Sequence, residues 1–370
     1  MYLNAGLVLV SIVLVMLAGA PGLHGGNSVA AEPDHIIGLL LPPEEPEAAS
    51  LRDGATLGVE VANQAPGPHF RLSIRGRIGQ WGADGVEAAR MAIDDGAQGL
   101  IAPLDGAASH LMLQVSGRTA IPVISLCADA SVSQTGVPWM LRIVPRTVEE
   151  ANALFAGIHA SHWTALIPGG RAGREAARDL RAAATNRLCS LEKSLEVNPS
   201  FTNATRLAQQ ILRQRPDAVL LWLDPATAGR LAKALRTAGF AGTLAGPGRL
   251  CSALFAAAAG DDMEGLIVAA PVLDPDAATA WRLFSDAFRV RFGREADATS
   301  AASYDASRLL IHILRQIGDH PAQEAFPISF CLAGASGNLA FDSQGNRKVN
   351  LQLMEAHRGQ FTPVGAGTNQ

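Results

Sequence analysis

The sequence predicts an α/β protein with two lobes, each built on a parallel β-sheet. After the first 31 residues, short β-rich runs alternate with Ala-rich amphipathic stretches, which is the pattern of parallel strands joined by crossover helices. The strand runs are almost continuously apolar, as expected for strands that are buried on both faces. With 370 residues, 48% of them hydrophobic, the chain exceeds the usual size of one domain, so we expect two.

The first half of the chain supplies the elements of one lobe. Its predicted strands are the apolar runs at residues 35–41, 70–76, 99–103 and 121–126. Its predicted helices are the amphipathic stretches at residues 48–63, 82–95 and 107–116. Each helix follows a strand, so these elements form consecutive strand-helix units.

The second lobe repeats this alternation. Its predicted strands lie at residues 163–168, 217–223, 242–246 and 265–271. Its predicted helices lie at residues 148–160, 171–184, 202–213 and 226–238. Two long helices at residues 277–292 and 303–317 precede a β-rich segment at 337–364. No low-complexity linker separates the halves, which favours lobes joined by several strand crossings over a single tether.

The first 31 residues predict a signal peptide. They contain no Asp, Glu, Lys or Arg, and residues 5–20 are almost entirely apolar. A membrane-spanning helix requires ~20 apolar residues, whereas Pro21 ends this run before the small residues Ser28, Ala30 and Ala31. We expect cleavage near Ala30 or Ala31 and export to the periplasm. An uncleaved anchor is the alternative, because the leader lacks the usual basic residue.

Charge and cysteine content limit the partners. The net charge is −4 and no Lys/Arg-rich run is present, so nucleic acid is not an expected partner. The four cysteines have no CxxC or Cys/His spacing, so neither a zinc site nor any other cofactor is predicted. Disulfide pairing stays open for all of them, namely Cys127, Cys189, Cys251 and Cys331.

The motifs that resemble catalytic ones favour structural roles. The glycines of PGGRAGREAARDL, at residues 168–180, follow neither GxGxxG nor GxxxxGK[ST], so they indicate a strand-to-helix turn. That departure also argues against a dinucleotide oxidoreductase. Ser109 and His110 are adjacent on a predicted helix and point in different directions, and no GxSxG is present. We therefore predict a protein that is not an enzyme.

Several stretches resemble a known family when taken in order. They are LRDGATLGVEVAN, QGLIAPLDGAAS, IPVISLCADAS, RPDAVLLWLDPATAGRLAKALRTAGF, MEGLIVAAPV and FSDAFRVRFGREADATSAASYDASRLL. From His35 onwards the chain resembles the type I periplasmic binding proteins, in the leucine/isoleucine/valine branch of amino-acid and amide receptors.

This resemblance implies two Rossmann-like lobes with three crossover strands. Lobe 1 would comprise residues 33–144 plus 272–332, and lobe 2 residues 145–271 plus 333–370. It also implies a monomeric substrate-binding protein that closes on a small polar solute between the lobes and delivers it to an ABC permease in the inner membrane. A sensor or assembly factor with a degenerate ligand site is the alternative.

In lobe 1 this chain departs from the family's ligand-binding pattern. The resemblance places Gly106, with Ala107 beside it, where the family has a Ser that binds the ligand carboxylate, and Asp129 where it has a Thr. Cys127 stands where a carbonyl faces the ligand. An ionised Asp129 would repel a carboxylate, so we expect a cationic or hydroxyl-rich solute, unless the site is degenerate. Trp81 either stacks on the ligand or covers the lobe edge.

Lobe 2 departs in the same way. The family's ammonium-binding Tyr and Glu positions fall on Asp224 and Gly248, with Arg249 beside the latter. Arg171 adjoins the position of a further family Tyr. Asp224 precedes Pro225 at a predicted helix start, so helix capping and ligand contact are both open for it, and they are equally open for Asp129.

Overall fold

The structure is a computed structural model that describes residues 35–76, 83–198, 203–318, 320, 322, 326 and 331–364. Residues 34–370 form one compact unit, distinct from residues 1–33, and the description below concerns that unit alone. The predicted signal peptide and Trp81 lie outside the described residues.

A five-stranded parallel sheet forms the centre of the first lobe, as the sequence predicts. The strand order is β2-β1-β3-β4-β5. The strands are β1 (His35–Leu40), β2 (Phe70–Arg75), β3 (Ala97–Ala102), β4 (Val123–Ser125) and β5 (Met140–Arg142). Because consecutive strands run in the same direction, their carboxyl ends share one edge of the sheet.

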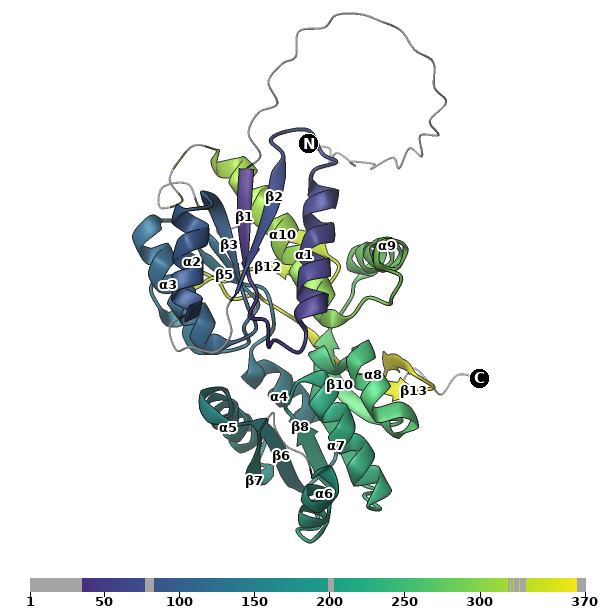
Figure 1. Cartoon of the computed structure of the whole chain (residues 1–370). Helices are drawn as coiled ribbons and strands as arrows, with labels where there is room; N and C mark the ends of the chain where they lie inside the picture. The colour runs from purple at the N-terminus through teal and green to yellow at the C-terminus, as the bar shows by residue number, and fades with distance from the viewer. Residues whose placement is uncertain are drawn as a thin grey trace, which may run out of the picture. The chain divides into compact units, whose positions relative to one another are not determined.

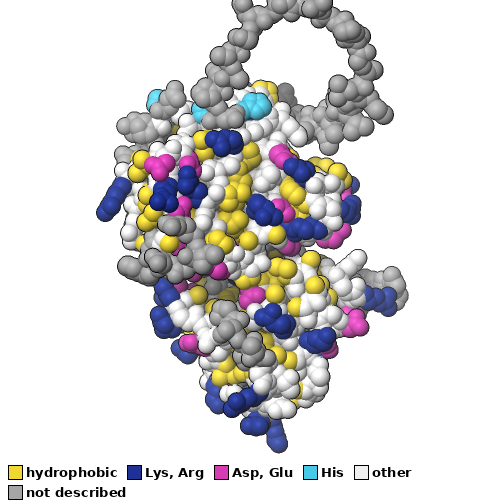
Figure 2. All heavy atoms as spheres, in the orientation of Figure 1, with side chains coloured by type: hydrophobic (Ala, Val, Ile, Leu, Met, Phe, Trp, Pro, Cys, Tyr) yellow, Lys and Arg dark blue, Asp and Glu magenta, His cyan; other side chains and the backbone are white. Residues whose placement is uncertain are grey.

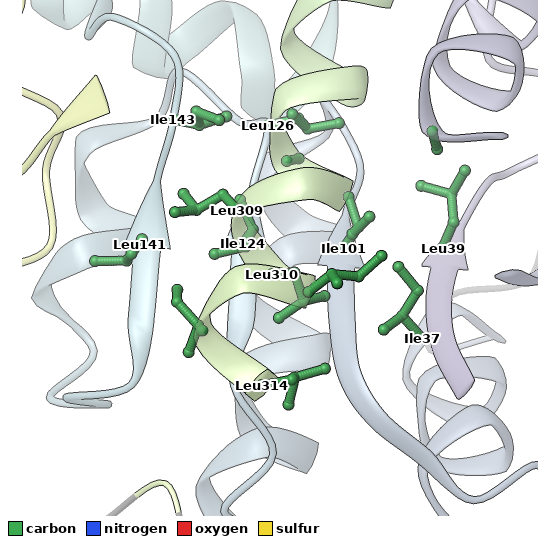
Figure 3. Packing of buried hydrophobic residues seen from close by; sticks show 14 of the residues in the cluster. Ile37, Leu39, Ile101, Ile124, Leu126, Leu141, Ile143, Leu309, Leu310 and Leu314 are labelled. Carbon is green, nitrogen blue, oxygen red and sulfur yellow. The ribbon is translucent and has the colours of Figure 1, made fainter. Parts of the chain in front are cut away.

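Helices cover both faces of this sheet (Figure 1). Helices α1 (Ala48–Ala62) and α10 (Ala298–Ile317) pack on one face, and α2 (Ala83–Ile93) and α3 (Gly106–Thr119) pack on the other. Figure 3 shows Ile37 and Leu39 of β1 facing Leu310 of α10. The alternate residues of the strands, such as Leu100, lie in the opposite core with Met112 of α3. Side-chain alternation along the strands thus fills two cores at once.

The contact between α1 and α10 depends on small residues. A methyl group added at Gly54 of α1 would lie 2.2 Å from the carbonyl oxygen of Ser300. At Gly58, one turn further on, it would lie 2.6 Å from the carbonyl oxygen of Tyr304. The two helices therefore pack with their backbones in direct contact, which leaves no room for a side chain between them.

The second lobe contains a seven-stranded sheet with the order β14-β13-β10-β9-β8-β6-β7. Its parallel strands are β6 (His162–Pro168), β7 (Ser190–Val197), β8 (Ala218–Leu221), β9 (Thr243–Pro247) and β10 (Leu266–Pro271). An antiparallel hairpin of β13 (Leu351–His357) and β14 (Gln360–Pro363) extends it beside β10. This hairpin forms the second half of the predicted C-terminal β-rich segment.

Helices also cover both faces of the second sheet. The helices on one face are α4 (Thr147–Gly157) and α5 (Gly170–Asn186). Those on the other are α6 (Ala204–Leu212), α7 (Pro225–Thr237) and α8 (Ala253–Ala259). Trp163 of β6, which is fully buried, packs edge-on against Phe155 of α4 with ring centroids 4.9 Å apart.

The chain returns to the first lobe after β10. Helix α9 (Pro275–Phe292) contacts α1, and α10 then enters the first core. The small hairpin of β11 (Cys331–Gly334) and β12 (Gly337–Ala340) follows, and Leu339 and Phe341 join the same core. We therefore propose that the third passage between the lobes lies at residues 342–350 rather than at 332–333.

The predicted elements agree with the structure except in a few places. Strands β5, β7 and β11 and helix α8 are not among the predicted elements, and α10 begins at Ala298 instead of at the predicted residue 303. Strand β7 has the sequence SLEKSLEV and lies at the sheet edge, largely exposed, so it lacks the apolar run that marks a buried strand. The first turn of α10 is ATSAAS, whose small polar residues hide the helical period.

The surface in Figure 2 carries mixed charge. Lys and Arg side chains are scattered among Asp and Glu over the described residues of the face shown. Within the part of the chain that the structure describes, no helix is long and apolar enough to cross a membrane. All four cysteines are free thiols in this structure, and of these Cys127 is buried and Cys331 exposed.

Candidate functional site

The predicted site residues follow the carboxyl ends of strands in both sheets. In the first lobe, Gly106 follows β3 and Asp129 follows β4. In the second lobe, Arg171, Asp224 and Arg249 follow β6, β8 and β9. Ligands of parallel α/β sheets bind at this edge, where helix N-termini also expose unpaired amides.

Asp129 is an enclosed acidic residue at this edge of the first lobe. Its side chain is only 6% exposed. Its Oδ1 accepts a hydrogen bond from the Ser131 amide at 2.9 Å, and its Oδ2 accepts one from the Ser131 hydroxyl at 2.8 Å. The first bond caps the short 3₁₀ helix Ala130–Gln134, so the capping role considered for Asp129 is present.

Gly106 lies directly against this carboxylate. A methyl group on Gly106 would be 2.9 Å from Asp129 Oδ2 and 3.4 Å from Cys127 Sγ. The Cys127 sulfur in turn accepts a hydrogen bond from the Asp129 amide at 3.3 Å. Gly106, which follows β3, is thus brought into contact with Cys127 and Asp129, which follow β4.

Arg171 and Glu175 meet Asp129 from the second lobe. Arg171 Nη2 lies 3.9 Å from Asp129 Oδ2, and Arg171 Nε donates to Glu175 Oε1 at 2.6 Å. Glu175 also shares a side-chain hydrogen bond with Asp129. Burial raises the pKa of Glu175, and the neighbouring Asp129 adds to this increase.

A second contact between the lobes joins Arg249 to Glu47. Arg249 Nη2 lies 2.7 Å from Glu47 Oε2, and the Glu47 side chain is only 1% exposed. Glu47 Oε1 also accepts a hydrogen bond from Thr299 Oγ1 at 2.5 Å. Burial raises the pKa of Glu47 to about 7, although Arg249 and Thr299 oppose the shift.

Glu150 of α4 is a second buried carboxyl group that interacts with Arg249. Its Oε1 accepts a hydrogen bond from the Gly248 amide at 2.8 Å. Burial raises the pKa of Glu150 to about 8, against the opposing effects of the Gly248 amide and Arg249. Gly248 is required here because a methyl group on it would lie 2.6 Å from the carbonyl oxygen of Ala269. The Gly248 backbone therefore positions Arg249 between two buried carboxyl groups.

Asp224 caps a helix and also contributes charge to the site. Its Oδ1 accepts a hydrogen bond from the Thr227 amide at 2.9 Å, at the start of α7. Burial raises the pKa of Glu45 in the first lobe, and the carboxylates of Asp105 and Asp224 raise it further against Arg249. Asp224 thus acts on Glu45 across the boundary between the lobes.

The described groups at this edge that resemble nucleophiles are engaged in other hydrogen bonds or stay protonated. His110 Nε2 lies 2.9 Å from Ser131 Oγ, and that hydroxyl donates to Asp129, so His110 is not placed to take a proton from Ser131. Ser109 donates to the carbonyl of Pro103 instead. Burial raises the pKa of the Cys127 thiol to about 12, which keeps it protonated and unreactive.

The structure divides the predicted site residues into two groups. Gly106, Cys127, Asp129 and Arg171 form one, with Ala107 following Gly106 in α3, and Asp224, Gly248 and Arg249 belong to the other. Four carboxyl groups that interact with these residues were not predicted as site residues: Glu45, Glu47, Glu150 and Glu175. Only the spacing of Glu175 four residues after Arg171 offered a signal, since such pairs meet on one helix face.

Comparisons of the sequence and the fold with known proteins identify the family. The family model described as "Periplasmic binding protein" matches residues 37–327. The chain therefore belongs to the periplasmic binding protein family, and its fold is that of the type I members. The comparison with curated proteins gave no match.

Solved structures of similar fold bind different solutes. A leucine-binding protein from Thermotoga maritima has a TM-score of 0.76 at 16% identity, covering 89% of this chain and 97% of its own. A branched-chain amino acid transporter substrate-binding protein from Streptococcus pneumoniae, in complex with isoleucine, has a TM-score of 0.77 at 13% identity, with coverages of 89% and 98%. An ABC transporter solute-binding protein from R. palustris in complex with benzoate has a TM-score of 0.77 at 18% identity, with coverages of 90% and 96%.

Proposed function

We propose that this protein is the exported substrate-binding component of an ABC importer. It binds one small polar solute in the cleft between its lobes, presents the closed form to a permease in the inner membrane, and acts as a monomer. The observation that carries the proposal is the convergence of charged residues from both lobes at one edge, where Arg249 meets Glu47 and Arg171 meets Asp129. Lobes that contact each other through such residues can exchange these contacts for contacts with a ligand.

A role without catalysis agrees with the chemistry of these groups. The Ser131 hydroxyl donates a hydrogen bond to Asp129, and the Cys127 thiol has a raised pKa, so neither is an activated nucleophile. Binding and release of an unchanged solute need only hydrogen-bonding and charged groups, which this edge supplies.

We predict that a solute from a broad thermal-shift screen will stabilise the protein and be recovered unchanged. At ~100 times its dissociation constant the solute should add about 2.7 kcal/mol to the free energy of unfolding. Arg249→Met should weaken binding, whereas the control Arg289→Met, on the exposed side of α9, should leave it unchanged. Product analysis by mass spectrometry completes the test, and conversion of the bound compound would contradict a non-enzymatic role.

The alternative is a sensor or assembly factor with a degenerate ligand site. The ion pair between Arg249 and Glu47 is also compatible with this function, since these groups of the two lobes pair with each other without a ligand. A chain of this kind would bind none of the screened solutes and would instead retain a protein partner through purification. The thermal-shift screen therefore separates the two functions.

Export leads to a separate prediction. The mature protein purified from the periplasmic fraction should begin close to Glu32, after cleavage near Ala30 or Ala31. Intact-mass measurement gives the mature N-terminus directly, and an Ala30→Arg, Ala31→Arg double variant should impair processing. A periplasmic product that retains Met1 would show that the leader is an uncleaved anchor.

A further inference from the structure

The surroundings of Asp129 are those of an anion-binding position. Its carboxylate lies against the first residue of α3, where the helix begins and its amides point toward incoming negative charge. It accepts both an amide and a hydroxyl hydrogen bond from Ser131. Arg171 approaches it from the other lobe, and His110 Nε2 lies 3.8 Å from the same Oδ2. Hydrogen-bond donors and positive charge thus lie around the Asp129 carboxylate, together with the carboxyl group of Glu175.

The space at this position is already filled. Asp129 Oδ2 lies 2.9 Å from the point that a side chain on Gly106 would occupy, and the Asp129 side chain is 6% exposed. Asp105 caps α3 through the Ala108 amide, and a ligand carboxylate placed beside Gly106 would overlap with that of Asp129. It would also be repelled, because two like charges in close contact are strongly unfavourable at low local dielectric.

The ionisation of Asp129 agrees with this arrangement. Burial alone would raise its pKa, but the hydrogen bonds from the Ser131 amide, Glu175 and the Ser131 hydroxyl lower it below its ordinary value, and His110 acts in the same direction. The charge that these donors stabilise is therefore supplied by the protein itself.

We infer that Asp129 is an internal carboxylate that fills the anion-binding position of the cleft and determines specificity, restricting the protein to solutes without a carboxylate at this point. The inference rests on the proposed function. The solutes it selects are amides and amines, in which a carbonyl or ammonium group replaces the carboxylate. Both suit this position, because an ammonium is attracted to the Asp129 carboxylate and an amide N–H can donate a hydrogen bond to it.

Removal of the internal carboxylate should create a binding position for an external one. In Asp129→Ala, formate can replace the deleted carboxylate beside Gly106 and Arg171. Formate should therefore raise the melting temperature of this variant and bind it at least about tenfold more tightly than the wild type, a difference of about 1.4 kcal/mol. The control Asp286→Ala removes an exposed carboxylate on α9, whose side chain is 58% exposed, and should show no such response.

A double variant tests whether the formate lies where the inference puts it. Arg171→Ala in the Asp129→Ala background should reduce formate binding, since Arg171 is the cation that faces this position from the second lobe. Equal responses of Asp129→Ala and Asp286→Ala to formate would overturn the inference. If Asp129→Ala does not fold, Asp129→Asn is used instead, because it keeps the shape of the side chain and removes its charge. Its affinities for matched amide and carboxylate ligands are then measured by calorimetry.

The second measurement compares matched ligands by calorimetry. The wild type should bind leucinamide more tightly than leucine, and benzamide more tightly than benzoate, and Asp129→Asn should shift each preference at least about tenfold toward the carboxylate. Tighter binding of leucine or benzoate by the wild type would refute the role of Asp129 while the transport function stands. Conversely, formate binding to Asp129→Ala by a protein that binds no solute in the screen would support the inference and contradict the transport function.

Discussion

Gly54→Ala is expected to destabilise the protein by at least about 2 kcal/mol, because the added methyl group has no space between α1 and α10. It would lie 2.2 Å from the carbonyl oxygen of Ser300, a backbone atom that cannot rotate away. The two helices would have to separate, which exposes the apolar residues that they share with the first sheet. Chemical denaturation followed by circular dichroism measures the loss.

A second helical glycine provides the matched control. At Gly85 of α2 the nearest atom to an added methyl group is Leu111 Cβ at 3.4 Å, an ordinary contact. Since Ala is favoured over Gly in a helix interior by about 1 kcal/mol, Gly85→Ala should leave stability unchanged or increase it. If Gly54→Ala behaved like Gly85→Ala, the close approach of α1 and α10 described above would be wrong.

Glu150→Gln is expected to make the protein more stable at alkaline pH and to weaken the dependence of stability on pH. Burial raises the pKa of Glu150 from 4.5 to about 8, and that of Glu47 to about 7. In the unfolded chain both carboxyl groups lose their protons near pH 4.5, so between about pH 4.5 and pH 8 the folded state binds more protons than the unfolded state. The stability that the protonated groups contribute is present below about pH 4.5 and is lost as the pH rises through 7 and 8.

The size of the effect follows from these shifts. Each unit of pKa shift corresponds to about 1.4 kcal/mol, so a neutral side chain at position 150 should add a few kcal/mol above pH 8. Gln keeps an uncharged oxygen for the Gly248 amide, which preserves the hydrogen bond that Glu150 makes. Urea unfolding at a series of pH values from 5 to 9 gives the free energy of unfolding as a function of pH for the wild type, for Glu150→Gln and for the surface control Glu60→Gln.

If the free energy of unfolding of the wild type increased between pH 5 and 8, the proposed protonation of Glu150 and Glu47 would be contradicted. The same conclusion would follow if the free energy of unfolding of Glu150→Gln changed with pH in parallel with that of the wild type. Glu60 pairs with Arg291 on the surface, so its removal should leave the shape of the curve unchanged.

Most of the fold could be predicted from the sequence because buried parallel strands have a strong local pattern. The run from Ile36 to Leu40 is apolar at nearly every position, since its alternate side chains enter two different cores. Strand β7 could not be predicted in this way, because it lies at an edge and its Glu and Lys side chains face solvent. Its place in the sheet depends on pairing with β6, which is not a local property.

The candidate site was predictable only in part. Asp129 and Asp224 stand at helix starts that the sequence indicates, and both cap helices in the structure. Their other contacts come from residues distant in sequence. Glu47 and Arg249 are 202 positions apart by their numbers, and nothing in either local pattern indicates that they meet. Such pairs follow from how the two lobes close together.

The late position of α10 in the chain affects how the protein is made. Helix α10 supplies Leu309, Leu310 and Ile313 to the core on one face of the first sheet, yet it begins at Ala298, after strands β6 to β10 of the second lobe. A nascent chain that emerges from its N-terminus therefore holds the first sheet with one apolar face covered by α1 alone while strands β6 to β10 of the second lobe are being synthesised. Part of that face stays accessible to chaperones until α10 is made, although the strands beneath it appear first.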